Sequence, residues 1–254
     1  MVKPVKIRNL LIGKGIPKIC VPITGGTKKE IEDQAGKIAA VVPDLVEWRA
    51  DHFGGVEDME KVREILSTLR GILREIPILF TFRRKEEGGV RSITTKDYVN
   101  LNQNVSKWGL ADAVDVELCF EKNGAKPLIA AIHGNDCKAV CSNHHFDRTP
   151  DTEEMFSLLN GMEEAGADIL KIAVMPQNPE DVLRLLYVTY KTGERSSCPL
   201  ISMAMGGVGA LSRLSGESFG SSVTFAAVGD VSAPGQLPMK DMRQALAIIH
   251  RALQ

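Results

Sequence analysis

Short apolar runs alternate with longer amphipathic stretches along the chain, and this alternation predicts the fold. Eight apolar runs have the near-continuous apolarity of strands buried on both faces. They are Ile19–Ile23, Leu45–Arg49, Ile78–Phe82, Ala113–Glu117, Ala139–Ser142, Ile169–Val174, Leu200–Met203 and Val223–Val228. The segments with helical periodicity between them are Lys28–Val42, Asp58–Arg74, Thr95–Trp108, Gly124–His133, Thr152–Ala165, Pro179–Thr192, Gly209–Gly216 and Met239–Leu253. Strands that alternate with helices predict a parallel sheet with crossover helices.

The number of these units favours a closed barrel. Eight strand–helix units within 254 residues predict a single α/β domain, a (β/α)8 TIM barrel that spans residues 1–254. A doubly wound open sheet is the alternative fold, but no G-x-G-x-x-G sequence follows the first predicted strand. The segment before that strand, Lys6–Leu11 followed by Gly13, Gly15 and Lys18, predicts a β-hairpin that closes the bottom of the barrel.

Composition and charge exclude several classes of partner. The chain has 31 basic and 32 acidic residues, so its overall field attracts neither nucleic acid nor an anionic membrane. The five cysteines lack the spacing of a zinc site and predict reduced thiols. No stretch approaches the ~20 apolar residues of a membrane span, and the N-terminus lacks the apolar core of a signal peptide. We therefore expect a cytoplasmic protein with no nucleic-acid or membrane partner.

Polar side chains stand at the C-terminal ends of nearly all the predicted strands, where the active sites of such barrels lie. They include Glu47, Arg49, Arg83, Asp115, Glu117, Asn143, His144, His145, Lys171 and Ser202, followed by Ser232 and Gln236 in the loop after the last strand. Each of them alone could cap a helix or form a rim ion pair of little energetic value. Their presence at nearly every strand end predicts one shared site.

Lys171 is the most informative of these residues, because it lies among hydrocarbon side chains in DILKIAVMP. Strand alternation places Ile169, Lys171 and Ala173 on one face, which we expect to line the barrel interior. Burial disfavours a lysine ammonium, and an uncharged amine attacks carbonyl carbon. Alternatively, Lys171 reaches the barrel rim or pairs with Glu117. The strand alone favours neither interpretation.

Three further side chains complete a candidate catalytic site. His144 ends the strand next to that of Lys171, so both can reach one pocket, and imidazole suits proton transfer. Glu87, before Gly88-Gly89, could orient a histidine or could be a solvated acid. Arg213 is a candidate clamp for a carboxylate. The histidines have no clustered cysteine or carboxylate ligands, so no metal site is predicted.

Eight motifs that contain these residues occur in one order across nearly the whole chain: EWRAD, FTFR with EGG, DVEL, SNHHF, DILKIAVMP, ISMAMGGVGALSR, GSSVTFAAV and SAPGQ. In this order they resemble the type I 3-dehydroquinate dehydratases of the shikimate pathway. The resemblance implies a hydro-lyase that converts 3-dehydroquinate to 3-dehydroshikimate by syn elimination. It also implies that no metal or organic cofactor is needed and that the protein is a homodimer.

The resemblance implies a role for each candidate residue. Lys171 would form an imine with the C3 ketone of the substrate and so acidify its C2 protons. His144 would remove a C2 proton and then protonate the departing C1 hydroxyl, while Glu87 orients it with Asp115 behind. Arg213 would bind the substrate carboxylate. The remaining substrate contacts would be Glu47, Arg49 and Arg83 for the hydroxyls, Ser232 and Gln236 in a closing lid, and Met203, Met205 and Phe225 as an apolar wall.

One position departs from the family pattern, and other functions compete. The family often has HDF where this chain has His144-His145-Phe146; the first histidine keeps the catalytic position, in altered surroundings. A class I aldolase would also use a lysine imine, but it should carry a phosphate site after the seventh or eighth strand. Arg213 and SAPGQ match a carboxylate better. A non-catalytic metabolite-binding barrel is the third possibility, and the presence of lysine, histidine and acid together argues against it.

Overall fold

Parallel strands form the centre of the molecule. The computed structural model describes residues 2–229 and 233–254. Strands β3 (Lys18–Ile23), β4 (Leu45–Arg49), β5 (Ile78–Thr81), β6 (Ala113–Glu117), β7 (Lys138–His144), β8 (Ile169–Val174), β9 (Leu200–Ala204) and β10 (Val223–Ala227) lie in one sheet. The sheet closes on itself because β10 pairs with β3, and Leu200 of β9 bridges to Ser221 just before β10. The predicted barrel is confirmed.

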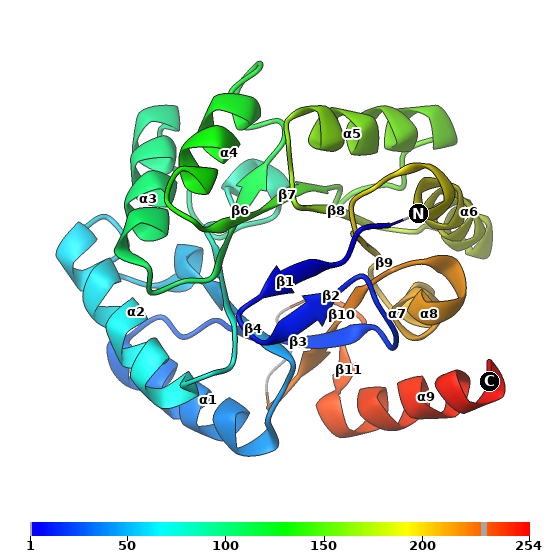
Figure 1. Ribbon diagram of the computed structural model, residues 1–254, viewed down its shortest axis with the longest axis horizontal. Coiled ribbons are helices and arrows are strands. Elements are labelled where there is room, and N and C mark those ends of the chain that lie inside the picture. Colours follow the sequence, from blue (N-terminus) through cyan, green and yellow to red (C-terminus); the bar gives the residue numbers. More distant parts are fainter. Residues whose placement is uncertain (1, 230–232) are drawn as a thin grey trace.

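Helices surround this barrel (Figure 1). They are α1 (Lys28–Val41), α2 (Met59–Leu73), α3 (Thr95–Trp108), α4 (Ala125–His133), α5 (Thr152–Glu164), α6 (Pro179–Arg195), α7 (Ala210–Leu214), α8 (Gly216–Phe219) and α9 (Met239–Ala252). Several begin at side chains that cap free backbone N–H groups; Thr27 and Glu30 form a capping box at α1, and Asp58 caps α2. The predicted helix Gly209–Gly216 is instead two short helices that meet at Ser215.

The two faces of each strand pack into different cores. Leu170, Ile172 and Val174 of β8 belong to the large cluster beneath the helices, whereas Ile169 and Ala173 belong to the cluster inside the barrel. Lys171, which shares a face with Ile169 and Ala173, therefore points into the barrel. The predicted orientation of this strand is confirmed.

The N-terminal hairpin closes one end of the barrel. Strands β1 (Val5–Ile7) and β2 (Leu10–Ile12) are antiparallel and lie across the centre of the ring in Figure 1. Ile7 and Ile12 pack against Leu45, Ile169 and Val223, which begin their strands, so the hairpin covers the N-terminal ends. It turns at Arg8, whose φ is 52°, rather than at the glycines that come after β2.

The opposite end is therefore the open one. Short strand β11 (Leu237–Pro238) pairs with the C-terminal end of β10, at Ala226 and Ala227. Residues 233–236, just before β11, accordingly lie at the C-terminal ends of the strands. No helix in the described part of the chain is long and apolar enough to cross a membrane.

We expect the hairpin to contribute strongly to stability. Ile7 is 2% exposed, and Ile7→Ala should lower the free energy of unfolding by about 2–5 kcal/mol, because it leaves a cavity under the barrel. Urea unfolding measures this difference. Leu11→Ala on the same hairpin is the matched control, since Leu11 is 39% exposed and its truncation should change stability by no more than about 0.5 kcal/mol. Equal losses in both variants would contradict the packing of this hairpin.

Candidate active site

A pocket lies at the C-terminal ends of the strands, opposite the hairpin. Its lining brings together residues from most of the barrel strands: Glu47, Arg49, Arg83, His144, Phe146, Lys171, Ala173, Met203, Met205, Arg213, Phe225, Ala233 and Gln236. The cavity among them has a volume of about 50 Å³, which suits a water molecule or two rather than an organic substrate. This volume is below the roughly 300–1,000 Å³ of most ligand pockets, and Ala233 and Gln236 in its lining come just before β11.

Most of the residues singled out from the sequence are in or beside this pocket. Glu87 and Asp115 lie directly behind its lining, in contact with His144 and Lys171. Ser202 faces outward instead, where its hydroxyl bonds to Thr189 of α6. Ser232 falls outside the described residues.

Lys171 is buried between two carboxylates. Its Nζ lies 3.0 Å from Glu47 Oε1 and 3.2 Å from Asp115 Oδ2, and 4.9 Å from the centre of the Phe225 ring. Burial would raise the pKa of Asp115, yet Arg83 and Lys171 hold that pKa below its usual value. The partners of the lysine are thus Glu47 and Asp115 and not Glu117, which was the alternative considered from the sequence.

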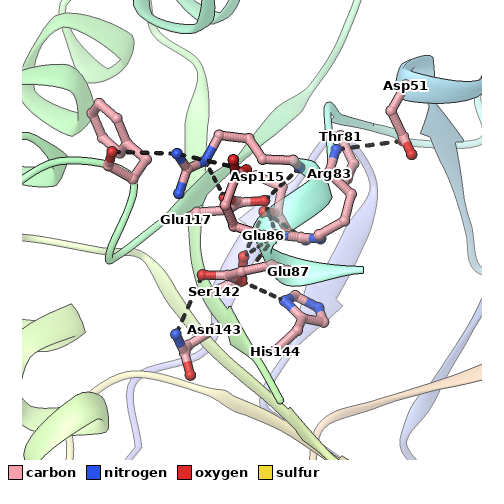
Figure 2. A network of polar contacts seen from close by, with 12 residues as sticks. Asp51, Thr81, Arg83, Glu86, Glu87, Asp115, Glu117, Ser142, Asn143 and His144 are labelled. Atoms are coloured by element: carbon pink, nitrogen blue, oxygen red, sulfur yellow. Dashed lines mark hydrogen bonds and ion pairs between the residues drawn. The ribbon is translucent and has the colours of Figure 1, made fainter. Parts of the chain in front are cut away.

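His144 and Glu87 form a hydrogen-bonded pair (Figure 2). His144 Nδ1 lies 3.0 Å from Glu87 Oε2, so the other ring nitrogen, Nε2, takes no part in this contact. Burial, then the positive charges of Arg83 and Lys171, lower the pKa of His144 well below its usual value. Burial, then the charge of Glu117, raise the pKa of Glu87 to about 8. Both shifts disfavour an ion pair of imidazolium and carboxylate, so the pair is uncharged when it holds two protons.

Two glycines allow Glu87 to reach His144. Glu87 ends a short 3-10 turn, η2 (Lys85–Glu87), and Gly88 comes next with a φ of 81°. A Cβ on Gly88 would lie 2.2 Å from the Phe146 ring, and one on Gly89 would lie 1.8 Å from the Arg83 carbonyl oxygen. The ring of Phe146 is also stacked on that of His144, with 6.5 Å between centroids. The chain therefore fits only glycine here, and Phe146 packs the turn against the imidazole.

Arg83 forms ion pairs with three carboxylates of the site. Its guanidinium lies 2.9 Å from Asp115, 3.0 Å from Glu117 and 3.5 Å from Glu87. Burial would lower the pKa of Arg83, but the charges of Asp115, Glu117 and Glu87 outweigh it and raise that pKa well above its usual value. Arg84 binds the other oxygen of Glu117 at 2.6 Å. Arg83 is thus a fixed cation within the pocket wall.

Arg49 is fixed by a residue that the sequence analysis did not single out. Asp51 accepts two hydrogen bonds of 2.8 Å from the Arg49 guanidinium and is itself fully buried. It also accepts hydrogen bonds from the backbone N–H groups of Arg83 and Val90. The signal was present in EWRAD, where the acid comes after the arginine at a spacing of two residues. Phe146 was likewise missed as a pocket residue.

Arg213 differs from the other buried cations because none of the described carboxylates contacts it. It is 1% exposed; Nη2 donates to the Pro234 carbonyl oxygen at 3.0 Å, and Nη1 lies 3.8 Å from Met203 Sδ. Its Nε is buried without a hydrogen-bond partner among the described residues. Burial lowers the pKa of Arg213 to about 10, which still leaves it charged at neutral pH. The guanidinium can therefore bind an anion in the pocket.

Comparison with known proteins agrees with this site. Residues 19–252 match the family model of type I 3-dehydroquinase. The chain belongs to this family. The 3-dehydroquinate dehydratases of Clostridium novyi and Bacillus licheniformis are 46% and 43% identical to it, over 99% and 100% of this chain and 100% of each relative. The family resemblance inferred from the motifs is confirmed.

Solved structures of the family have the same fold. The type I 3-dehydroquinate dehydratase of Clostridium difficile aligns with a TM-score of 0.96 and 43% identity, covering 99% of this chain and 100% of that one. By contrast, the carboxyl transferase domain of Rhizobium etli pyruvate carboxylase is 16% identical with a TM-score of 0.69, which shows a shared fold alone. Membership of the 3-dehydroquinase family makes this chain a carbon–oxygen hydro-lyase, and it excludes the aldolase and non-catalytic alternatives.

Proposed function

We propose that the chain dehydrates 3-dehydroquinate to 3-dehydroshikimate through an imine on Lys171, with His144 as the general acid and base. The observation that carries this proposal is the buried Lys171 amine in a pocket that His144 and Arg213 also line. The solved Clostridium difficile relative contains covalently modified comenic acid, which fits a site with a nucleophile. No metal or organic cofactor takes part in the proposed reaction.

Imine formation begins with the loss of a proton from Lys171. Glu47 is the proposed acceptor, because its Oε1 lies 3.0 Å from Nζ and the lowered pKa of Asp115 makes that carboxylate a poor base. The amine lone pair then attacks the C3 carbonyl carbon. The former ketone oxygen takes one proton from the nitrogen and a second back from Glu47, and it leaves as water when the C=N bond forms. The protonated imine nitrogen can accept electrons from the C2–H bond, so the C2 proton becomes acidic.

The Glu87–His144 pair can supply both proton transfers of the elimination. When the pair holds one proton, that proton is on His144 Nδ1 and is hydrogen-bonded to the Glu87 carboxylate. The Nε2 lone pair is then free, and His144 acts as a base. After it takes the C2 proton, the pair holds two protons and acts as an acid toward the C1 hydroxyl, which leaves as water. Because one imidazole performs both steps from one side of the ring, the elimination is syn. Water then adds to the C3 carbon of the product imine and the C–N bond breaks, which releases 3-dehydroshikimate and the Lys171 amine.

The remaining pocket residues would bind the substrate and exclude water. Arg213 is proposed to bind the C1 carboxylate, since it is the buried cation without a described carboxylate partner. Glu47, Arg49 and Arg83 would contact the ring hydroxyls. The apolar wall would consist of Met203, Met205 and Phe225, and the segment with Ser232 and Gln236 would close over the imine.

We further propose that the protein is a cytoplasmic homodimer, as the family resemblance implies. Sedimentation equilibrium should then give twice the mass of one chain at micromolar concentration. A single-chain mass there would contradict the dimer. Cell fractionation should recover the enzyme with the cytoplasmic proteins; recovery with another fraction would contradict the assigned compartment.

Borohydride reduction should trap the substrate on Lys171. With 3-dehydroquinate present, mass spectrometry of the reduced protein should find the ligand on that lysine, and Lys171→Met should abolish both trapping and product formation. Lys138→Met is the matched control, because Lys138 starts the neighbouring strand and pairs with Asp168 at the far end of the barrel. His144→Ala should still be trapped, while formation of the conjugated enone slows by ~10²–10⁴. Labelling at another lysine would overturn the assignment.

Removing the charge of Arg213 should weaken substrate binding. Arg213→Met should lower kcat/KM about 10²-fold or more, mainly through KM, because the substrate carboxylate loses a buried charged partner. Arg213→Lys should restore part of the loss. Arg243→Met is the control, since Arg243 donates to backbone carbonyls at the end of α1 and should leave the kinetics unchanged. An unchanged KM in Arg213→Met would place the carboxylate elsewhere.

A further inference from the structure

We propose that Asn143 is a positioning residue that holds Glu87 on His144 and keeps the Glu87–His144 pair in the one-proton form that acts as a base. This inference rests on the proposed roles of His144 and Glu87, and it adds a residue to which the sequence analysis gave no role. It is carried by the geometry at the end of β7.

Neighbouring residues of β7 bind the two oxygens of one carboxylate. Ser142 and His144 share the face that points into the barrel, and Ser142 Oγ bonds there to Asp115 and Arg83. Asn143 points to the other face, away from the pocket. Its Nδ2 nevertheless lies 3.3 Å from Glu87 Oε1, while His144 Nδ1 lies 3.0 Å from Oε2 (Figure 2). Turn η2 carries the Glu87 carboxylate across the end of the strand, between the two side chains.

The orientation of the amide favours the ionised carboxylate. An N–H group that faces Oε1 attracts a carboxylate, whereas the amide oxygen in that place would repel it. Asn143 is 5% exposed, and its Oδ1 is buried without a hydrogen-bond partner in the described part of the chain. The other contact of Nδ2 is the Cys119 sulfur at 3.8 Å, a weak acceptor. A buried, unpaired carbonyl oxygen destabilises the fold, and an apolar residue would avoid it. The hydrogen bond from Asn143 to Glu87 is the interaction that an apolar residue could not make.

Charges of both signs act on Glu87, and an uncharged hydrogen-bond donor adds to those that favour its ionised form. Arg83 and Arg84, which come after β5, favour the carboxylate, while Asp115 and Glu117 of β6 favour the neutral acid. The other titratable groups close by are Cys119 after β6, Cys141 and His144 on β7, and, on the far side of His144, Lys171 of β8. Burial and Glu117 together raise the pKa of Glu87 to about 8, close to neutral pH. A hydrogen bond to the charged form opposes that rise.

The test is the titration of the pair in the whole protein without substrate. The chain has five histidines, so ¹⁵N-histidine NMR can follow each ring, and His144→Gln identifies the signal of His144. Asn143→Leu should raise the apparent pKa of the pair by about one unit, because the carboxylate loses a donor. Asn143→Asp should raise it further, since a second carboxylate would face Glu87.

The same shift should appear in the kinetics. The acid limb of kcat/KM, which reports the free enzyme, should move to higher pH by the same amount in Asn143→Leu, and the rate should recover above that limb. Trapping on Lys171 should persist. Asn102→Leu is the matched control: Asn102 is a fully buried amide on α3 without a hydrogen-bond partner among the described residues, and its loss should not move the titration.

Each outcome decides the proposal. An unmoved titration in folded Asn143→Leu, or a rate lowered equally at every pH, would reduce Asn143 to a packing residue. If Asn143→Leu does not fold, Asn143→Ser should show the same rise, because its shorter side chain cannot reach Glu87, and an unmoved titration there also overturns the proposal. Failure of the proposed function is distinguishable, since it would appear in the unaltered protein as no enone and no trapping on Lys171. The titration would still report on Asn143.

Discussion

Positive charge buried inside the barrel is the constraint on which the site depends. An ammonium or guanidinium group out of water is very costly unless anions contact it. Lys171 is accordingly bound by Glu47 and Asp115, and Arg83 by Asp115, Glu117 and Glu87. Because Asp115 contacts both cations and Glu87 contacts both Arg83 and His144, a continuous chain of polar contacts joins Lys171, the proposed nucleophile, to His144, the proposed acid and base. The ion pairs that stabilise these buried charges thus also position the groups proposed to carry out the reaction.

Arg213, in contrast, has no contact with a carboxylate among the described residues. Its guanidinium is as buried as that of Arg83, but its described contacts are a carbonyl oxygen and a thioether, and burial lowers its pKa to about 10. A buried guanidinium without an anionic partner destabilises the fold, and an anionic ligand would supply that partner. The Pro234 carbonyl oxygen that it binds belongs to the segment proposed to close the pocket. Arg213 would therefore connect the proposed carboxylate binding with the proposed closure.

The sequence predicted the framework better than the contacts within it. Apolar runs located each barrel strand to within two residues, and alternation placed Lys171 inside, because both depend only on the strand period. Alternation could not identify Glu47 and Asp115 as the partners of Lys171 in place of Glu117. That choice depends on how far each parallel strand is shifted along its neighbour and on the tilt of the strands. The hairpin turn at Arg8 was missed because a non-glycine residue with positive φ leaves no compositional signal.

His145 favours the same protonation state of the Glu87–His144 pair as Asn143 does. The family often has an aspartate there, and a negative charge next to His144 would favour the doubly protonated pair. His145 removes that charge, and any positive charge it carries lowers the pKa of His144 further. Its backbone N–H donates to the Ala173 carbonyl oxygen, so β7 stays paired with β8, and the contact between His144 and Glu87 is intact. The hydrogen bond from Asn143 to Glu87 and the absence of an aspartate charge at residue 145 therefore both favour the one-proton pair, in which His144 is proposed to abstract a proton.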